Sequence, residues 1–244
     1  MKTPSTPTGL LILGFSFFTG NCLALTPFSD DFTGTRLDKA SWQQGSYGTG
    51  AILKQSGGRL NFSMPVANSA EADAWFELTA THPGANENWQ VILDVTNSNN
   101  HGGDSAPGFW LYNSADPNDA VFLEFFGKGA KGGFDASFVV NGLYSAGADL
   151  VANPGVSKGS IRIVYSKTTR ILAFSYDSTG SADGYKWTKL GTFATNGIGG
   201  DRRGNWEMDP VTGTFTIRIN GYVEGKVVST GTETMDHFVL KAVK

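Results

Sequence analysis

Apolar and polar residues alternate with a period of two in run after run of this chain. The segments RLNFSM (59–64), WQVILDV (89–95), IRIVY (161–165) and FTIRI (215–219) all show this alternation. It is typical of β-strands that bury one face, because successive side chains of a strand point to opposite sides of its sheet. No capped segment of ten or more residues shows helical spacing of its apolar positions. The chain is therefore predicted to be all-β, with little or no helix beyond its N-terminal segment.

Turn-forming clusters separate these runs. Glycine supplies 32 of 244 residues, charged residues only 17% and aromatic residues 12%, a composition that excludes helical bundles, coiled coils and disorder. Many short strands with one apolar face pack as two sheets face to face. We expect a two-sheet antiparallel β-sandwich with strands near 51–55, 59–64, 71–79, 89–96, 109–113, 120–126, 134–140, 160–165, 171–176, 186–193, 215–221 and 236–241.

The first 24 residues have the pattern of a secretory signal peptide. Lys2 gives a charged start, residues 10–18 form a short apolar run, and small residues surround Ala24. The apolar run is too short to span a bilayer. We expect an exported protein (secreted, periplasmic or at the cell surface) whose mature part, residues 25–244, is a single domain without membrane insertion. Cys22 lies in the removed segment, so the mature chain would hold no disulfide.

The charge balance bears on the partners. The net charge is −3, and removal of Lys2 with the signal peptide takes it to −4. No run of like charges occurs. The sequence therefore predicts no positively charged patch of the kind that binds nucleic acid or an anionic membrane surface. We exclude both as partners.

Four segments carry a resemblance to a known family. They are FSDDFTGTRLDKASWQ (28–43), GGRLNFSM (57–64), the run from IRIVY to GTF (161–193) and STGTETMDHFVL (229–240). Together they resemble the concanavalin A-like lectin/glucanase superfamily, in particular LamG-like jelly-roll modules of exported bacterial proteins. The resemblance implies a jelly roll whose concave face, in relatives, often binds glycans and in some members cleaves them. A fold by itself does not assign a function.

The glucanase branch of that superfamily carries three carboxylates on one strand, spaced E-x-D-x-E or E-x-D-x-x-E. Here Glu71, Asp73 and Glu77 read E-x-D-x-x-x-E and would share one strand face with Trp75. Retaining hydrolysis needs two carboxyl groups about 5–5.5 Å apart, whereas Asp73 and Glu77 lie about 13 Å apart along an extended strand. These three residues are weak catalytic candidates, and a solvated strand face is the favoured interpretation.

Sugar binding needs an exposed aromatic ring flanked by polar groups. Trp206 fits best, because it lies beside Arg203 and Glu207 in the long irregular stretch 196–213. Trp75 comes next, followed by Trp110 and Tyr112. The alternative is that these rings lie in the core, where tryptophan is more often found. Core positions are expected for the remaining tryptophans, Trp42, Trp89 and Trp187.

The cofactor that the sequence supports best is a structural calcium ion. In related jelly rolls an ion ties the start of the chain to the last strand, which by resemblance would involve Asp31, or its neighbour Asp30, and Asp236. Carboxylates are suitable ligands for such a hard cation. The alternative is that these aspartates accept hydrogen bonds in turns. The loop 97–104, rich in Asn, Gly and Asp, is a second and weaker candidate.

Two glycine motifs do not indicate nucleotide binding or a nucleophile. GKGAKG (127–132) and GVSKG (155–159) match G-x-G-x-x-G and G-x-S-x-G, but both motifs work at a strand-to-helix turn, and strands are expected after each of them. The sequence thus favours an exported, non-enzymatic carbohydrate-binding or adhesion module. The alternatives are a structural or interaction protein without sugar affinity, and a polysaccharide hydrolase or lyase.

Overall fold

The computed structural model describes residues 25–67, 70–129, 132–144 and 149–244. The predicted signal peptide, residues 1–24 with Cys22, lies outside these ranges, and so does part of the glycine motif at 127–132.

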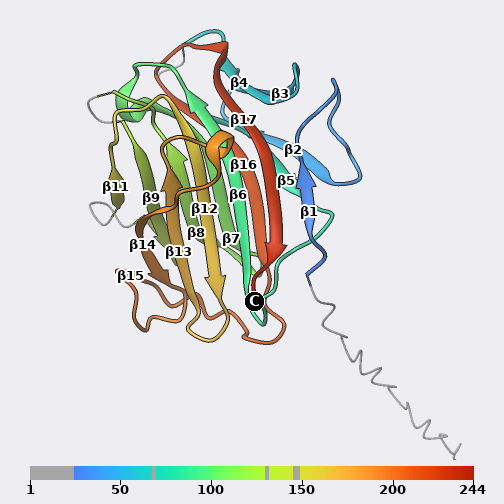
Figure 1. Ribbon diagram of the computed structural model, residues 1–244, viewed down its shortest axis with the longest axis vertical. Helices are drawn as coiled ribbons and strands as arrows, with labels where there is room; N and C mark the ends of the chain where they lie inside the picture. The colour runs from blue at the N-terminus through green and yellow to red at the C-terminus, as the bar shows by residue number, and fades with distance from the viewer. Residues whose placement is uncertain (1–24, 68–69, 130–131, 145–148) are drawn as a thin grey trace, which may run out of the picture.

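Two β-sheets make up the described chain (Figure 1). Sheet A has the order β15-β14-β13-β12-β6-β17-β4-β3, with β1 paired to β17, and sheet B has the order β10-β9-β8-β7-β16-β5-β2, with β11 paired to β9. Sheet A contains β1 (Phe28–Asp30), β3 (Ile52–Gln55), β4 (Leu60–Met64), β6 (Trp89–Asn97), β12 (Lys158–Ser166), β13 (Ile171–Asp177), β14 (Thr188–Ala194), β15 (Arg202–Arg203) and β17 (Val228–Ala242). Sheet B contains β2 (Trp42–Tyr47), β5 (Glu71–Leu78), β7 (Ser105–Asn113), β8 (Asp116–Phe125), β9 (Phe134–Val140), β10 (Leu143–Tyr144), β11 (Leu150–Ala152) and β16 (Phe215–Glu224).

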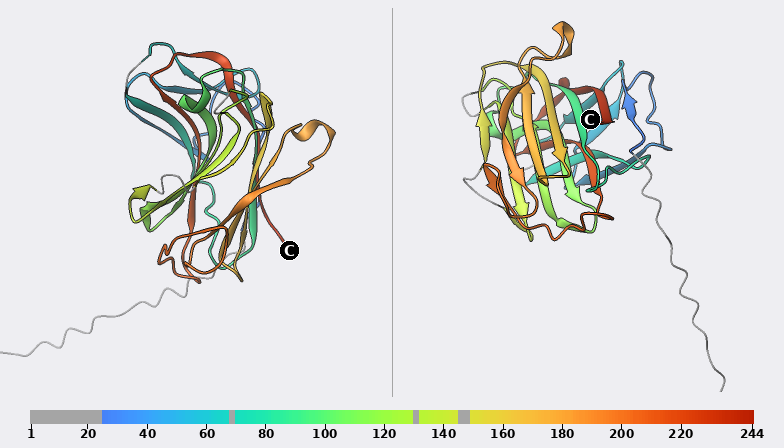
Figure 2. Two further views of the ribbon diagram at one scale, coloured as in Figure 1. Left: turned by 90° about the vertical axis from the view of Figure 1, so that its left-hand side faces the viewer. Right: turned by 60° about the horizontal axis from the view of Figure 1, so that its bottom comes forward.

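The two sheets pack face to face, and sheet B curves so that its outer face is the concave one (Figure 2). Alternate residues of each strand enter the space between the sheets. In β5 these are Ala72, Ala74, Phe76 and Leu78, all 2% exposed or less. The buried apolar side chains of both sheets form one cluster, which is the burial that the period-two pattern predicts. The other residues of β5 therefore lie on the outer face of sheet B.

All twelve predicted strands are present, with boundaries that shift by four residues or fewer, except that β17 begins eight residues before the predicted start at 236. The short strands β1, β2, β10, β11 and β15 were not predicted. In β2, the sequence WQQGSY has a single buried residue, and the other four have two or three residues each. Strands this short or this polar show no alternation of apolar and polar residues. They form because a neighbouring strand pairs with them, and not because they bury an apolar face.

Helix is limited, within the described ranges, to two three-residue 3₁₀ turns at Gly102–Asp104 and Ser181–Asp183. This confirms the prediction of little or no helix. No helix in this part of the chain has the length and apolar character needed to cross a membrane.

The chain start is tied to the sandwich by the SDDF motif. Asp30 accepts hydrogen bonds from the Phe32 backbone N–H at 2.7 Å and from the Trp42 indole N–H at 2.9 Å. Trp42 and Trp89 are 2% and 0% exposed, which confirms their predicted core positions. The same prediction is wrong for Trp187, whose half-buried ring stacks on Tyr185 with ring centroids 4.7 Å apart and lies under the Arg162 guanidinium.

Candidate functional site

Four half-buried aromatic rings gather on the outer face of sheet B. They come from three strands, and we call them the aromatic platform: Trp75, Trp110, Tyr112 and Phe122. The rings of Trp75 and Trp110 are stacked, with centroids 6.4 Å apart and planes 30° from parallel. Trp110 also contacts Phe122, with centroids 5.0 Å apart. The sheet thus presents a continuous apolar surface of aromatic rings to solvent. A single strand could present only isolated side chains.

Arg218 of β16 holds two rings of the platform in place. Its guanidinium carbon lies 4.8 Å from the centroid of the Trp75 ring and 4.7 Å from that of Tyr112. Its Nε donates to Glu77 Oε2 at 2.8 Å. Arginine stacks on aromatic faces and pairs with carboxylates at the same time. The positive charge of Arg218 is therefore already partnered, and its role is to position the platform.

Three carboxyl groups lie across the same face, and we call them the acidic row: Asp73, Glu124 and Asp135. Burial, with a contribution from the charge of Glu71, raises the pKa of Asp73 to about 7. Burial raises the pKa of Glu124 to about 8 against the opposing hydrogen bond from Trp110. Burial and the charge of Asp149 raise the pKa of Asp135 to about 7. Near neutral pH these groups are therefore partly protonated, and perturbed pKa values of this kind are common at binding and catalytic sites.

Glu124 and Asp135 are direct neighbours, because they are register partners on the adjacent strands β8 and β9. Glu124 Oε1 accepts a hydrogen bond from the Trp110 indole N–H at 3.0 Å, so the acidic row touches the aromatic platform. Gly108 provides the room, since a Cβ on it would lie 3.0 Å from the Glu124 side chain. The absence of a side chain on β7 at this point lets Glu124 lie across that strand.

A cavity of about 190 Å³ opens beside the acidic row. We call it the acidic pocket, and its polar lining consists of Glu124, Asp135, Ser137, Tyr144 and Asp149. The Tyr144 hydroxyl lies 3.4 Å from Asp149 Oδ1. Burial raises the pKa of Asp149, and the charge of Arg202 opposes this rise. The pocket thus continues the platform toward the edge of sheet B formed by β9, β10 and β11.

Two buried polar side chains under the platform lack hydrogen-bond partners. Asp73 Oδ1 and both amide atoms of Asn220 make no hydrogen bond, although the two residues are 2% and 0% exposed. The Asn220 amide lies beside the Asp73 carboxyl and opposes the rise of its pKa, but no hydrogen bond of good geometry joins them. Leaving a buried polar group unpaired costs about 1–3 kcal/mol, so these atoms are poised to receive polar groups of a ligand.

Sequence reasoning found part of this site. Trp75, Trp110 and Tyr112, predicted as separate candidates, are brought together by the strand order β5-β16-β7. Glu71, Asp73 and Glu77 share their face with Trp75, as predicted, and their catalytic role stays a prediction. The interpretation as a solvated strand face is wrong for Asp73, which is 2% exposed. Glu124 and Asp135 were missed. In the sequence, each of them is only an acidic residue at an outward position of an apolar strand, in FLEF and in FDAS. Only the pairing of β8 with β9 shows that the two carboxyl groups are neighbours.

The prediction that Trp206 presents an exposed ring is wrong. Trp206 is 1% exposed and packs against Phe193 and Phe215, with ring centroids 5.5 and 6.3 Å away. Two backbone contacts hold the loop inward. The Trp206 backbone N–H donates to the Thr195 carbonyl oxygen, and the Trp206 carbonyl oxygen accepts from Asn113 Nδ2. Arg203 and Glu207 are exposed, but without an accessible indole ring they form no sugar platform.

The predicted ion-binding residues are neighbours in space. Strand β1 pairs with β17 so that Asp30 is opposite Phe238, and the charge of Asp31 adds to the burial that raises the pKa of Asp236. However, Asp31 Oδ1 lies 2.9 Å from His237 Nδ1. Calcium takes six to eight oxygen ligands, and within the described residues no group of three or more His, Cys, Asp or Glu is arranged to hold a metal. The side chains alone do not complete such a site, and calcium binding stays a prediction.

Comparisons with known proteins complete this description. No family model and no curated protein matches the chain. Solved structures do match. One is an endo-acting O-glycanase that prominent members of the human gut microbiota express, with TM-score 0.58 and 12% identity, over 89% of this chain and 99% of that one.

Two further matches are a lectin and a glucanase. Lectin UEA-II complexed with galactose has TM-score 0.55 and 10% identity, over 90% of this chain and 99% of the lectin. A prokaryotic β-1,3-1,4-glucanase (lichenase) from a mouse hindgut metagenome has TM-score 0.50 and 15% identity, over 89% of this chain and 100% of that one. At such identities the likeness establishes the fold, and not the activity.

Proposed function

We propose that this chain, which has the concanavalin A-like jelly-roll fold, binds a glycan on the outer face of sheet B. The observation that carries the proposal is the half-exposed stack of Trp75 and Trp110 with carboxyl groups at its edge. A pyranose has an apolar face of C–H groups and a rim of hydroxyl groups. An aromatic plate beside polar groups matches both features at once.

A non-enzymatic role is the first choice. Glu124 is only 8% exposed and accepts the Trp110 N–H, while Glu77 is committed to Arg218. These two carboxyl groups thus position the platform, and neither of them stands free above it. Lectins as well as glycanases share the fold, which supports carbohydrate binding without specifying catalysis. The N-terminal signal pattern supports an exported protein that meets its glycan outside the cytoplasm.

The decisive variant is Trp75→Ala, assayed on a glycan array and then by calorimetry with the best ligand. We expect the affinity to fall at least tenfold. Trp187→Ala is the matched control, because this half-buried indole also lies against an arginine, Arg162, at 4.3 Å, but on sheet A. Full binding by Trp75→Ala, or equal losses in the two variants, would contradict the proposal. Circular dichroism and thermal melting verify that both variants fold.

One observation favours a second candidate, a polysaccharide hydrolase. Glu124 and Asp135 are directly opposite on neighbouring strands, where Cβ atoms lie about 4.5–5.5 Å apart, and retaining glycosidases need carboxyl groups about 5–5.5 Å apart. Both have a pKa near or above neutrality, as a general acid requires. Release of reducing ends from a bound glycan, abolished by Glu124→Gln, would establish this candidate.

A further inference from the structure

We infer that the preferred ligand is a glycan with free amino groups, that the acidic pocket receives one of its ammonium groups, and that Asp73 and Asn220 receive a neighbouring amine or hydroxyl group. This inference rests on the proposed glycan-binding function and names the class of ligand. It follows from the balance of charge on the outer face of sheet B, from the cavity beside the platform, and from the unpartnered atoms beneath it.

The charge on this face is strongly unbalanced. Its outward carboxyl groups are Glu71, Asp73, Glu77, Glu124, Asp135 and Glu224, with Asp149 at the edge. Arg218 is the basic residue among the outward positions of these strands, and Glu77 pairs with it at 2.8 Å. The charge of Arg202, in β15 of sheet A, acts on Asp149. The raised pKa values leave Asp73, Glu124 and Asp135 partly protonated at pH 7. An ammonium group beside them stabilises their charged form and is attracted to it, whereas the negative charge of a uronic or sulfated glycan does the opposite.

The acidic pocket has the shape for such a group. Its 190 Å³ accommodate an amine and its nearest carbons, and its lining combines three carboxyl groups with the Ser137 and Tyr144 hydroxyls. Among the residues that the structure describes, no lysine or arginine lines it. Glu124 lines the pocket and accepts the Trp110 indole N–H, so the pocket lies directly beside the platform. A sugar ring stacked on the platform would therefore direct its edge at the carboxyl groups of the pocket.

The unpartnered atoms supply an independent sign of a ligand. Asn220 lies opposite Gly108, and Gly108 lies opposite Glu124, so the Asn220 amide stands between the carboxyl groups of Asp73 and Glu124. Its oxygen and nitrogen, and Asp73 Oδ1, have no partner. An amine or hydroxyl group that reaches these atoms would satisfy the two oxygens, and a hydroxyl group would accept from the amide nitrogen. An organic cation fits this site better than a metal, because the described residues hold no metal-binding group of side chains.

The test uses matched oligosaccharide pairs that differ only in the amine, free or N-acetylated, built from glucosamine and from galactosamine. They are printed on one array at pH 7, and the strongest pair is then measured by calorimetry. We expect the free amine to bind at least tenfold tighter, with a preference that shrinks in 0.5 M NaCl. Asp135→Asn combined with Glu124→Gln should reduce the preference to less than threefold. Asp183→Asn, an exposed carboxyl on the β13–β14 loop, should leave it unchanged.

The outcomes separate the inference from the function beneath it. Equal binding of both forms, lost in Trp75→Ala, would overturn the amine preference and leave glycan binding intact. A preference that survives in the double variant would overturn the role of the acidic pocket. Absence of binding to every glycan on the array would overturn the proposed function itself.

Discussion

At the residue scale, Glu233 shows how burial sets chemistry. It is 0% exposed, accepts hydrogen bonds from Ser105 and from Asn99 on one oxygen, and leaves the other oxygen without a partner. Burial raises its pKa to about 7, against the opposing hydrogen bonds. The folded protein therefore holds this proton more tightly than the unfolded chain does, in which the pKa is near its usual value of about 4.3.

The sign of the pH dependence follows. Between about pH 4.5 and 7 the folded state keeps the Glu233 proton and the unfolded state loses it, so the free energy of unfolding falls as pH rises. Glu233→Gln should match wild type near pH 4 and exceed it near pH 8 by about 2–3 kcal/mol. Urea unfolding at both pH values measures this. The same difference between variant and wild type at pH 4 and at pH 8 would contradict the assignment.

Trp206 gives a second residue-scale prediction. Because its ring is enclosed by Phe193 and Phe215, Trp206→Ala should lower the free energy of unfolding by about 3–5 kcal/mol. Any variant that still folds should bind glycan like wild type. Chemical denaturation and array binding of one preparation provide both readouts. Unchanged stability with lost binding would place Trp206 in the binding site instead.

At the element scale, glycines set how closely strands approach. Gly221 of β16 faces β4 of the other sheet, and a Cβ there would lie 2.1 Å from the Phe62 ring. Gly221→Ala should therefore push the sheets apart or tilt Phe62 and cost about 1–3 kcal/mol. Gly103→Ala is the control, because nothing lies within 4 Å of its added methyl group. Melting temperatures compare the two, and equal values would show that the inter-sheet contact adapts.

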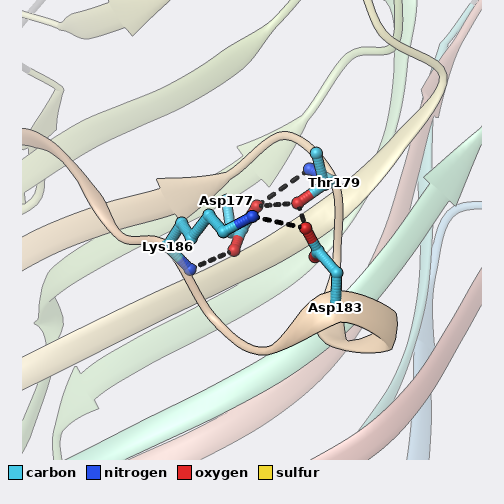
Figure 3. A network of polar contacts seen from close by, with 4 residues as sticks. All are labelled: Asp177, Thr179, Asp183 and Lys186. Atoms are coloured by element: carbon cyan, nitrogen blue, oxygen red, sulfur yellow. Dashed lines mark hydrogen bonds and ion pairs between the residues drawn. The ribbon is translucent and has the colours of Figure 1, made fainter.

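The loop from β13 to β14 depends on one aspartate (Figure 3). Asp177, 2% exposed, accepts from the Thr179 N–H at 2.8 Å and from the Lys186 N–H, while Asp183 pairs with the Lys186 ammonium at 2.7 Å. Burial alone would raise the pKa of Asp177, but these hydrogen bonds lower it. Asp177→Ala should cost about 1–3 kcal/mol and open the loop to proteolysis. Asp183→Ala should leave stability and protease resistance nearly unchanged, because solvent screens its exposed ion pair. Equal protease resistance of both variants would show that the loop does not depend on Asp177.

At the scale of the whole molecule, the predicted signal peptide and the fold meet at Leu25. The Leu25 backbone nitrogen donates to Glu87 Oε2 at 2.7 Å, and the Leu25 side chain is 7% exposed. Cleavage after Ala24 would convert this amide into an ammonium group paired with Glu87. We expect N-terminal sequencing of the exported protein to begin at Leu25, and Glu87→Gln to destabilise that form by about 1 kcal/mol. A different first residue would refute the cleavage site.

The sequence by itself determined the strands and their faces. Alternation in β4, β6, β12 and β16 determined which side chains face the other sheet, because a period of two leaves one possible inner face per strand. It also placed Trp75 beside Asp73 and Glu77, since residues two apart share a face. These are local properties, because the apolar residues that become buried already alternate in the sequence.

Only the tertiary structure decided which strands are neighbours, and with that the site. Trp75, Trp110 and Glu124 are separated by 35 and 14 positions in the chain, and no local pattern shows that β16 enters between β5 and β7 or that β9 carries Asp135 to Glu124. Trp206 was wrongly predicted for the same reason. Its loop has the sequence of an exposed segment, but its indole packs in the core against Phe193 and Phe215, which come from separate strands. Pairing order and inter-sheet space arise from contacts between distant segments, so a single sequence does not encode them in any local pattern.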